Sequence, residues 1–331
     1  MGRAGNPQVL FYSLLLLTVG VAIQVITNPI LLFVGMVLIG IGLGLSGGNV
    51  LLPSIIQEYF PKKSALLTGI YPAMMTLFSG IGTATVVPIL KATNFSTTMM
   101  VFAVLTVLTL IVWGSAFKQF PQTNHQLESE EEAEGDFSVK NYRVTWLITL
   151  FFGIQSLLAY SLMTWMPKYW IDHGFVATTS GVLATFFQIF GIPMAIVTPM
   201  IAKRKPGMIG MALFSAIAVS VATFGMLFPT HSFFLNPLWS ALSGMGTAVA
   251  FTLSIVFFQQ KTVRFEQTAE LSGTAQSAGY LLAAIGPIAS GYLINQFHSW
   301  DMIFAIYLIL SISLGFLGFG IIFSKKIGAE S

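Results

Sequence analysis

The chain has 331 residues, of which 55% are hydrophobic and 8% are charged, with a mean hydropathy of +0.82 and a net charge of +3. A soluble domain carries about 25% charged residues, so this composition excludes a protein surface that faces water on all sides. It is typical of a polytopic membrane protein, whose few positive charges lie in loops and do not indicate nucleic-acid binding.

Long apolar segments alternate with short polar ones along the whole chain. The apolar segments are roughly 19–27 residues long, which is the length of a membrane-spanning helix and about twice that of a barrel strand. We therefore expect an all-α bundle. Ten helices are predicted, at 9–27, 30–56, 65–90, 98–117, 144–167, 178–202, 207–228, 233–258, 271–294 and 301–323.

An acidic segment at 119–143 divides these helices into four before it and six after it. Residues 128–136 hold six of the twelve acidic residues, and such a like-charge block repels itself and stays solvated. A flexible linker is therefore favoured over a regulatory docking site. The predicted organisation is an incomplete N-terminal half-bundle at 1–118, a cytoplasmic linker at 119–143 and a C-terminal half-bundle at 144–331.

The positive charges gather on one side of this predicted bundle. If the N-terminus is cytoplasmic, thirteen of the fifteen Lys and Arg residues fall in cytoplasmic segments, and only Lys91 and Lys168 fall outside. Positive residues are enriched in the cytoplasmic loops of membrane proteins. We therefore expect a multi-pass protein of the cell (inner or plasma) membrane with both termini in the cytoplasm. Trp165 and Trp170, near the predicted outer boundary, are expected to be interfacial anchors.

Two parts of the chain share a pattern of glycines 204 residues apart. GIGLGLSGG at 40–48 corresponds to GMGTAVAF at 244–251. The matched pairs are Gly40 with Gly244, Gly42 with Gly246, Gly69 with Gly273, and Gly82 with Gly286. Such a pattern is typical of transporters built from two parallel repeats. The same offset would place the counterparts of the fifth and sixth helices before residue 1, so ten of an expected twelve helices lie in this sequence.

Neutral polar side chains lie deep within several predicted helices, whereas no Asp, Glu, Lys, Arg or His does. An unpaired amide in hydrocarbon is costly, so each is expected to face another helix or a water-filled cavity. The candidate solute-binding residues are Asn49, Tyr71, Gln155, Tyr160, Gln188, Gln276 and Tyr280.

Each candidate also has a purely structural interpretation. Gln276 and Tyr280 are one helical turn apart, and a hydrogen bond to a neighbouring helix is as good an interpretation as contact with a solute. Asn49 could instead cap a carbonyl that a kink at Pro53 sets free. The pair Gln155 and Tyr160 is the one favoured for contact with a solute.

Several signals for catalysis are absent from the sequence. It contains no GxxxxGK[ST] phosphate loop, no HExxH motif and no cysteine. No pair of carboxylates lies where it would face a cavity between the predicted helices. We therefore expect no enzyme activity, no catalytic or metal-binding residue and no cofactor.

Four stretches together resemble one family. They are GGNVLLPSIIQEYFP (47–61), TGIYPAM (68–74), FGIQSLLAYSLMTWMPKYWIDHG (152–174) and LSGTAQSAGYLLAAIGPIASGYL (271–293). They are similar to the fourth, fifth, seventh and eleventh helices of the cyanate permease and 2-nitroimidazole exporter family, within the major facilitator superfamily. The resemblance covers essentially the whole chain.

This resemblance implies a twelve-helix fold with alternating access around a central cavity. By position it places Asn49 on the fourth helix, Gln155 and Tyr160 on the seventh, and Gln276 and Tyr280 on the eleventh. It also implies an arginine on the first helix, a counter-charge for a small anion, which would lie before residue 1. No arginine lies within the predicted helices of this sequence.

The sequence therefore predicts a secondary active transporter of a small organic or anionic solute, such as cyanate-like anions or nitroimidazole-like compounds. We expect a monomer in the lipid bilayer that binds a small-molecule solute and no nucleic acid. The alternative is a remnant that does not transport, or a membrane interaction protein.

Overall fold

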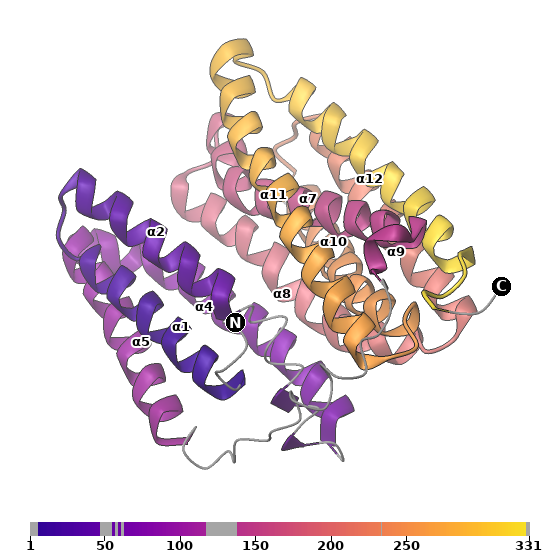
Figure 1. Ribbon diagram of the computed structural model, residues 1–331. Coiled ribbons are helices and arrows are strands. Elements are labelled where there is room, and N and C mark those ends of the chain that lie inside the picture. Colours follow the sequence, from indigo (N-terminus) through magenta and orange to yellow (C-terminus); the bar gives the residue numbers. More distant parts are fainter. Residues whose placement is uncertain are drawn as a thin grey trace. The chain divides into compact units, whose positions relative to one another are not determined.

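The computed structural model describes residues 6–46, 55–56, 59–60, 63–116, 138–232 and 234–328. These residues form long helices, with one short 3-10 turn, η3 (Val139–Asn141), and no strand among them. The helices of Figure 1 are α1 (Asn6–Ile23), α2 (Pro29–Ser46), α4 (Ser64–Ala92), α5 (Phe95–Ala116), α7 (Arg143–Asp172), α8 (Ala177–Ile201), α9 (Lys205–Met226), α10 (Leu235–Gln260), α11 (Phe265–Phe297) and α12 (Asp301–Phe323).

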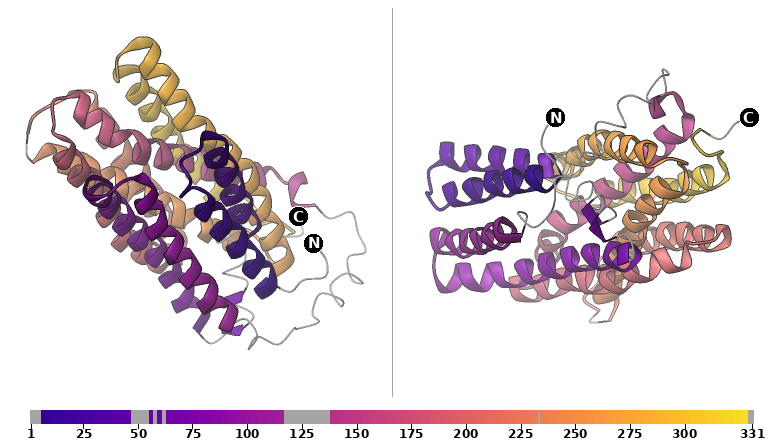
Figure 2. Two further views of the ribbon diagram at one scale, coloured as in Figure 1. Left: turned by 90° about the vertical axis from the view of Figure 1, so that its left-hand side faces the viewer. Right: turned by 60° about the horizontal axis from the view of Figure 1, so that its bottom comes forward.

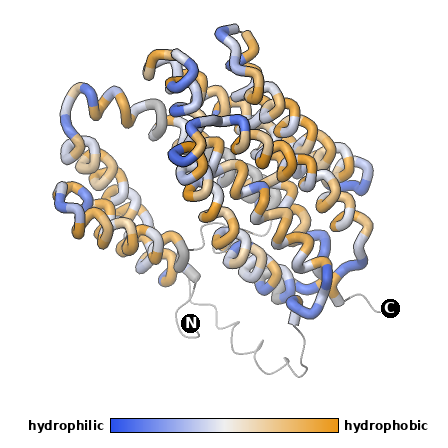
Figure 3. Tube along the Cα trace, turned by 90° about the horizontal axis from the view of Figure 1, so that it is seen from above, coloured by the Kyte–Doolittle hydropathy of each residue, from blue (hydrophilic) through white to orange (hydrophobic). Residues whose placement is uncertain are grey.

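Each of these helices overlaps one of the ten predicted apolar segments, so the all-α prediction is confirmed. Seven are long and apolar enough to span a membrane: Phe95–Ala116, Arg143–Asp172, Ala177–Ile201, Lys205–Met226, Leu235–Gln260, Glu270–Phe297 and Asp301–Phe323. Shorter apolar helical stretches lie at Pro7–Ile23, Pro29–Leu43 and Leu77–Ala92. In Figure 3 the hydrophobic colour runs along the helices, and the hydrophilic colour gathers at their ends.

The prediction that the fifth helix ends at Pro167 is wrong, because α7 continues to Asp172. Contacts made by the last turn hold it in place. The Tyr169 hydroxyl donates to the carbonyl of Met226 over 2.7 Å, at the end of α9. The prediction for Trp170 is wrong as well, since its side chain is only 1% exposed and packs edge-on against Tyr169.

The described residues group into two compact units. Unit 1 comprises Met1–Thr68 and Thr85–Phe137, and unit 2 comprises Gly69–Ala84 and Ser138–Ser331. Unit 2 thus contains α7 to α12, which gather into one bundle in Figures 1 and 2. The middle of α4 groups with unit 2, whereas the expected boundary kept all of α4 in the first half. The expected domain limits stay a prediction.

The helix pairing inside each unit follows the predicted repeat. In unit 1, α1 packs along α2 and α5, and in unit 2, α9 packs along α10 and α12. Shifted by 204 residues, α4 would span 268–296, which lies within α11. The same shift moves α2 to 233–250, which overlaps α10, and α5 to 299–320, which overlaps α12.

One glycine pair of the repeat makes the same contact in both units. A Cβ at Gly42 would lie 2.8 Å from the carbonyl oxygen of Ser13 on α1. A Cβ at Gly246 would lie 2.9 Å from the carbonyl oxygen of Ser215 on α9. Each glycine therefore lets its helix approach the backbone of the neighbouring helix. This shared contact supports the prediction of two parallel repeats.

Within unit 2, α8 and α10 meet through backbone atoms. A Cβ at Gly244 would overlap the carbonyl group of Phe187 on α8, and a Cβ at Gly191 would lie 3.2 Å from the carbonyl oxygen of Gly244. Small residues at such a crossing let helices associate closely in a membrane, where lipid is as apolar as the side chains.

One end of unit 2 carries most of its positive charge. There the ammonium of Lys261 donates to the carbonyls of Ile322, over 3.1 Å, and Ser324, over 2.6 Å, at the C-terminus of α12. Gln260 Nε2 donates to the carbonyl of Ala202 over 2.9 Å, at the end of α8. A cation at a helix C-terminus is favourable because the last carbonyls there lack helical partners.

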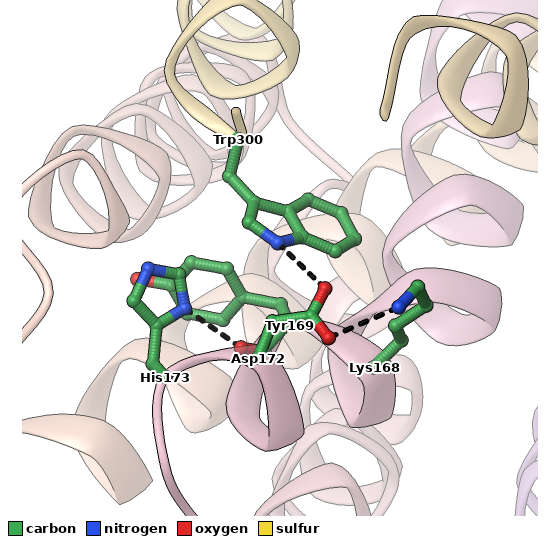
Figure 4. A network of polar contacts seen from close by, with 5 residues as sticks. All are labelled: Lys168, Tyr169, Asp172, His173 and Trp300. Atoms are coloured by element: carbon green, nitrogen blue, oxygen red, sulfur yellow. Dashed lines mark hydrogen bonds and ion pairs between the residues drawn. The ribbon is translucent and has the colours of Figure 1, made fainter. Parts of the chain in front are cut away.

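A polar network holds the opposite end of unit 2 together (Figure 4). Asp172 accepts from Lys168 Nζ over 3.0 Å and from Trp300 Nε1 over 3.1 Å. His173 Nδ1 lies 2.7 Å from the carbonyl oxygen of Tyr169. The bond from Trp300 joins the end of α7 to the start of α12, and the bond from Tyr169 joins it to the end of α9.

Replacement of Gly244 by alanine is expected to destabilise the chain, because the new methyl group meets backbone atoms of α8 that cannot rotate away. Overpacking of this kind costs about 1–3 kcal/mol. The matched control is Gly210→Ala on α9, where a Cβ would meet no described atom within 4 Å. Thermal unfolding in detergent should show a lower midpoint for Gly244→Ala and an unchanged or raised midpoint for Gly210→Ala. Equal midpoints would contradict the packing described.

Candidate functional site

The candidate site lies where α7 and α11 pack side by side in unit 2. A Cβ at Gly153 on α7 would lie 3.2 Å from the Cα atom of Gly279 on α11. A Cβ at Gly279 would lie 2.6 Å from the ring of Phe152. These two glycines therefore allow the helices to touch, and they bring the side chains on either side of the contact together.

Three aromatic rings meet beside this contact. The rings of Phe152 and Tyr280 lie edge to face, with centroids 5.1 Å apart. The ring of Tyr160 lies 6.3 Å from that of Tyr280, tilted by 48°. Tyr160 is 46% exposed, so its ring forms an open edge of the cluster. The structure thus joins two predicted site residues, Tyr160 and Tyr280, and adds Phe152, which was not predicted.

Gln155 on α7 is 1% exposed. Its Nε2 atom donates to Ser156 Oγ over 2.7 Å, while its Oε1 atom is buried without a hydrogen-bond partner among the described residues. A buried acceptor left without a donor costs about 1–3 kcal/mol, so it either carries strain or awaits a donor. Tyr160 follows Gln155 by five positions, so the two side chains project about 140° apart around the helix axis.

Gln276 on α11 is buried, and its Nε2 atom donates to Ser272 Oγ over 2.7 Å. Ser272 lies one turn away on α11 itself. This bond is therefore not the hydrogen bond to a neighbouring helix that the sequence also allowed. Gln276 lies one turn before Tyr280 on the same face of the helix. The amide therefore extends the polar side of the aromatic cluster.

The remaining predicted residues lie elsewhere. Gln188 is a buried residue of α8, and a Cβ at Gly80 of α4 would lie 3.7 Å from its Cβ. The hydroxyl of Tyr71 on α4 is buried without a hydrogen-bond partner in the described part of the chain. Asn49 and Pro53 lie outside the described residues.

A buried hydroxyl cluster between α7, α11 and α12 was not predicted. Ser290 Oγ lies 2.6 Å from the hydroxyl of Tyr307, and it also lies 2.7 Å from the carbonyl oxygen of Gly286. The hydroxyl of Ser161 is buried close to Gly286. Serine and tyrosine are common in membrane helices, so their presence alone is no signal of a site. These three residues lie on three different helices, and only the packing of those helices brings them together.

The chemistry of the site is neutral. Residues 144–167 and 271–297, which form most of α7 and α11, contain no Asp, Glu, Lys, Arg or His. Among the described residues, no group of three or more His, Asp or Glu side chains is placed to hold a metal ion. The arrangement offers amides, hydroxyls and aromatic faces, which can hydrogen-bond to and stack on a small polar molecule.

The chain is similar in sequence to known membrane transporters. Residues 1–281 match the Major Facilitator Superfamily. The chain is 32% identical over 318 residues to the 2-nitroimidazole transporter of Escherichia coli (strain K12), covering 96% of this chain and 79% of that protein. It is 30% identical over 320 residues to the uncharacterized transporter YycB of Bacillus subtilis (strain 168), covering 96% and 78%.

Two more distant likenesses agree with these. The cyanate transport protein CynX of Escherichia coli (strain K12) is 24% identical over 284 residues, covering 85% of this chain and 71% of that protein. The transporter FucP, crystallised in the outward conformation, superposes with a TM-score of 0.72 at 10% identity, over 97% of this chain and 84% of that one. The family match over residues 1–281, these relatives and the fold show that the chain belongs to the Major Facilitator Superfamily.

Proposed function

We propose that the chain carries a small, planar, polar organic solute across the membrane and that the seam between α7 and α11 binds this solute. The relatives named above are called transporters, which supports transport as the activity. Alternating access, in which two half-bundles rock about a central site, is the mechanism that two parallel repeats favour.

The observation that carries this proposal is the meeting of two tyrosine rings across the seam, Tyr160 of α7 and Tyr280 of α11, with Tyr160 46% exposed at its edge. Gln155 lies about 140° around α7 from Tyr160, and its buried Oε1 atom, which has no hydrogen-bond partner among the described residues, is a separate candidate contact. A planar heteroaromatic solute would place its ring beside the two tyrosines. The faces of Tyr160 and Tyr280 offer stacking surfaces for such a ring. Gln276 and the hydroxyls of both tyrosines would supply further hydrogen bonds.

Of the two solute classes expected, the neutral heteroaromatic class fits this seam better than a small inorganic anion. An anion in a membrane-embedded site needs a counter-charge, and α7 and α11 supply none along residues 144–167 and 271–297. Nitroimidazole-like compounds are therefore the first solutes to test. Cyanate serves as the comparison.

The remaining features of the proposal follow from charge and composition. The protein lies in the plasma or inner membrane of the cell. Following the positive-inside rule, the basic end of unit 2 and both termini face the cytoplasm. The chain acts as a monomer, binds no nucleic acid and catalyses no reaction. Asn49, Tyr71 and Gln188 stay candidate solute contacts on other helices.

Transport is tested with the full chain in proteoliposomes loaded with radiolabelled 2-nitroimidazole. Saturable flux is expected, and Gln155→Leu should lower it about 10-fold or more, the effect of leaving one polar group of the solute unpaired. The control is Gln296→Leu, which makes the same change at an exposed position near the end of α11. Absence of flux with any nitroimidazole or cyanate would favour the non-transporting alternative.

A stability measurement separates a binding role of Gln155 from a structural one. Gln155→Met replaces a buried amide by an apolar side chain of similar length, so the unpaired acceptor disappears. Such a replacement is nearly neutral or stabilising when the polar group supports no structure. The unfolding midpoint in detergent should stay level or rise. A fall of several degrees would show that the amide holds the bundle together, and its role in solute binding would lose its support.

A further inference from the structure

A groove lies on unit 2 between the start of α7 and the end of α12, away from the seam of α7 and α11. It encloses about 480 Å³, and its walls are apolar side chains of both helices, among them Leu147, Phe316 and Phe323. Gly320 lines the groove, and a Cβ there would lie 3.7 Å from the side chain of Leu147, an ordinary contact distance. Arg143 lies at the polar end of the same groove.

Positive charge surrounds that polar end. The guanidinium of Arg143 is exposed and forms no ion pair or hydrogen bond with any residue that the structure describes. The ammonium of Lys205 lies 4.0 Å from the centroid of the Phe323 ring, which is itself a wall of the groove. Burial, and then the nearby charges of Lys205 and Lys326, lower the pKa of Lys261 beside the end of α12. Lys205 and Lys326 therefore lie close enough to Lys261 for their charges to interact.

The polar end of the groove has the features of a membrane–water interface. Trp146, one turn into α7, is 49% exposed and donates through Nε1 to the carbonyl of Lys140 over 3.0 Å. Exposed tryptophans with one polar contact are typical of the interface, where the ring sits at headgroup level. Phe316 lies on α12 two turns before Phe323, deeper along the groove. It is 75% exposed, as expected of a residue that faces acyl chains.

We propose that this groove binds an anionic phospholipid, with the phosphate at Arg143 and one acyl chain lying along Leu147, Gly320 and Phe316. Basic pockets between helices on the cytoplasmic side of membrane proteins hold anionic headgroups. The apolar length of the groove requires a chain, which a soluble phosphate ester lacks. The cationic end requires a net negative headgroup, which a zwitterionic lipid lacks. Bound there, the lipid would join α7 to α12 beside the C-terminal cap formed by Lys261.

Native mass spectrometry of the full chain in a neutral detergent tests this proposal. The chain is titrated with dioleoyl phosphatidylglycerol and, separately, with dioleoyl phosphatidylcholine. We expect retained phosphatidylglycerol, with affinity lowered about fivefold by Arg143→Gln, the effect of one cationic side chain at a membrane surface. Gly320→Leu, which fills the groove, should lower it at least as much. Lys203→Gln removes the same charge at the same end outside the groove lining, and it should bind like the wild type.

Three results would overturn the proposal. One is equal retention of phosphatidylglycerol by wild type, Arg143→Gln and Gly320→Leu. Another is equal retention of phosphatidylcholine and phosphatidylglycerol by the wild type. The third is displacement of the lipid by millimolar glycerol 3-phosphate, which would indicate a site for soluble phosphate esters. If Gly320→Leu fails to fold, Arg143→Glu replaces it, because Arg143 is exposed and its reversal should weaken binding further than Arg143→Gln does.

Discussion

Close contact between helix backbones at glycine is the constraint on which unit 2 depends. In a membrane the surrounding lipid is as apolar as the helix surfaces, so burial of apolar area does little to hold helices together. Dispersion contacts and interhelical hydrogen bonds must do so, and both require short distances. Gly244 supplies such a contact between α8 and α10, and Gly153 with Gly279 supplies it between α7 and α11. The positions of the candidate site residues follow from this second contact.

The seam of α7 and α11 combines features that packing alone does not explain. Phe152 and Tyr280 fill the contact, as a helix interface requires. Further around α7, Gln155 keeps a buried acceptor that has no donor among the described residues. Packing alone would favour an apolar residue there. The open edge at Tyr160 provides access to the aromatic faces. A site that is stable without a solute, yet has unused hydrogen-bonding capacity, suits a transporter, which must release what it binds.

Much of the fold could be predicted from the sequence, because lipid leaves helices as the only simple solution for long apolar segments. The glycine offset of 204 pairs α2 with α10 and α4 with α11, and the bounds of these helices agree with that pairing. The offset also pairs Gly40 with Gly244, but these two glycines make different contacts. A Cβ at Gly40 would meet no described atom within 4 Å, whereas one at Gly244 would meet the backbone of α8. No described helix of unit 1 takes the place of α8. The two helices expected before residue 1 stay a prediction.

The site could be predicted only in part. The hydropathy pattern showed which positions within the helices are polar. It did not show which neighbouring helix each of these side chains faces. Tyr160 and Tyr280 meet, whereas Gln155 points well away from Tyr160, because five residues do not make a whole number of turns. The end of α7 was placed too early, because tertiary bonds of Tyr169 and Asp172 outweigh the preference of Pro167 to end a helix. Such bonds join residues far apart in sequence and leave no local pattern.

We propose that the open edge of the α7–α11 seam faces a water-filled, solute-binding cavity. The sequence contains no cysteine, which makes a direct test possible. Single cysteines are introduced by Tyr160→Cys and, as a control that we expect to face lipid, by Ile217→Cys on α9, whose native side chain is 58% exposed. Maleimides react with the thiolate, which forms only where water reaches. In lipid nanodiscs, a hydrophilic maleimide should label Tyr160→Cys rapidly, 2-nitroimidazole should slow that labelling, and Ile217→Cys should stay unlabelled. If Tyr160→Cys is labelled no faster than Ile217→Cys, or if solutes leave its rate unchanged, the seam is not the transport site.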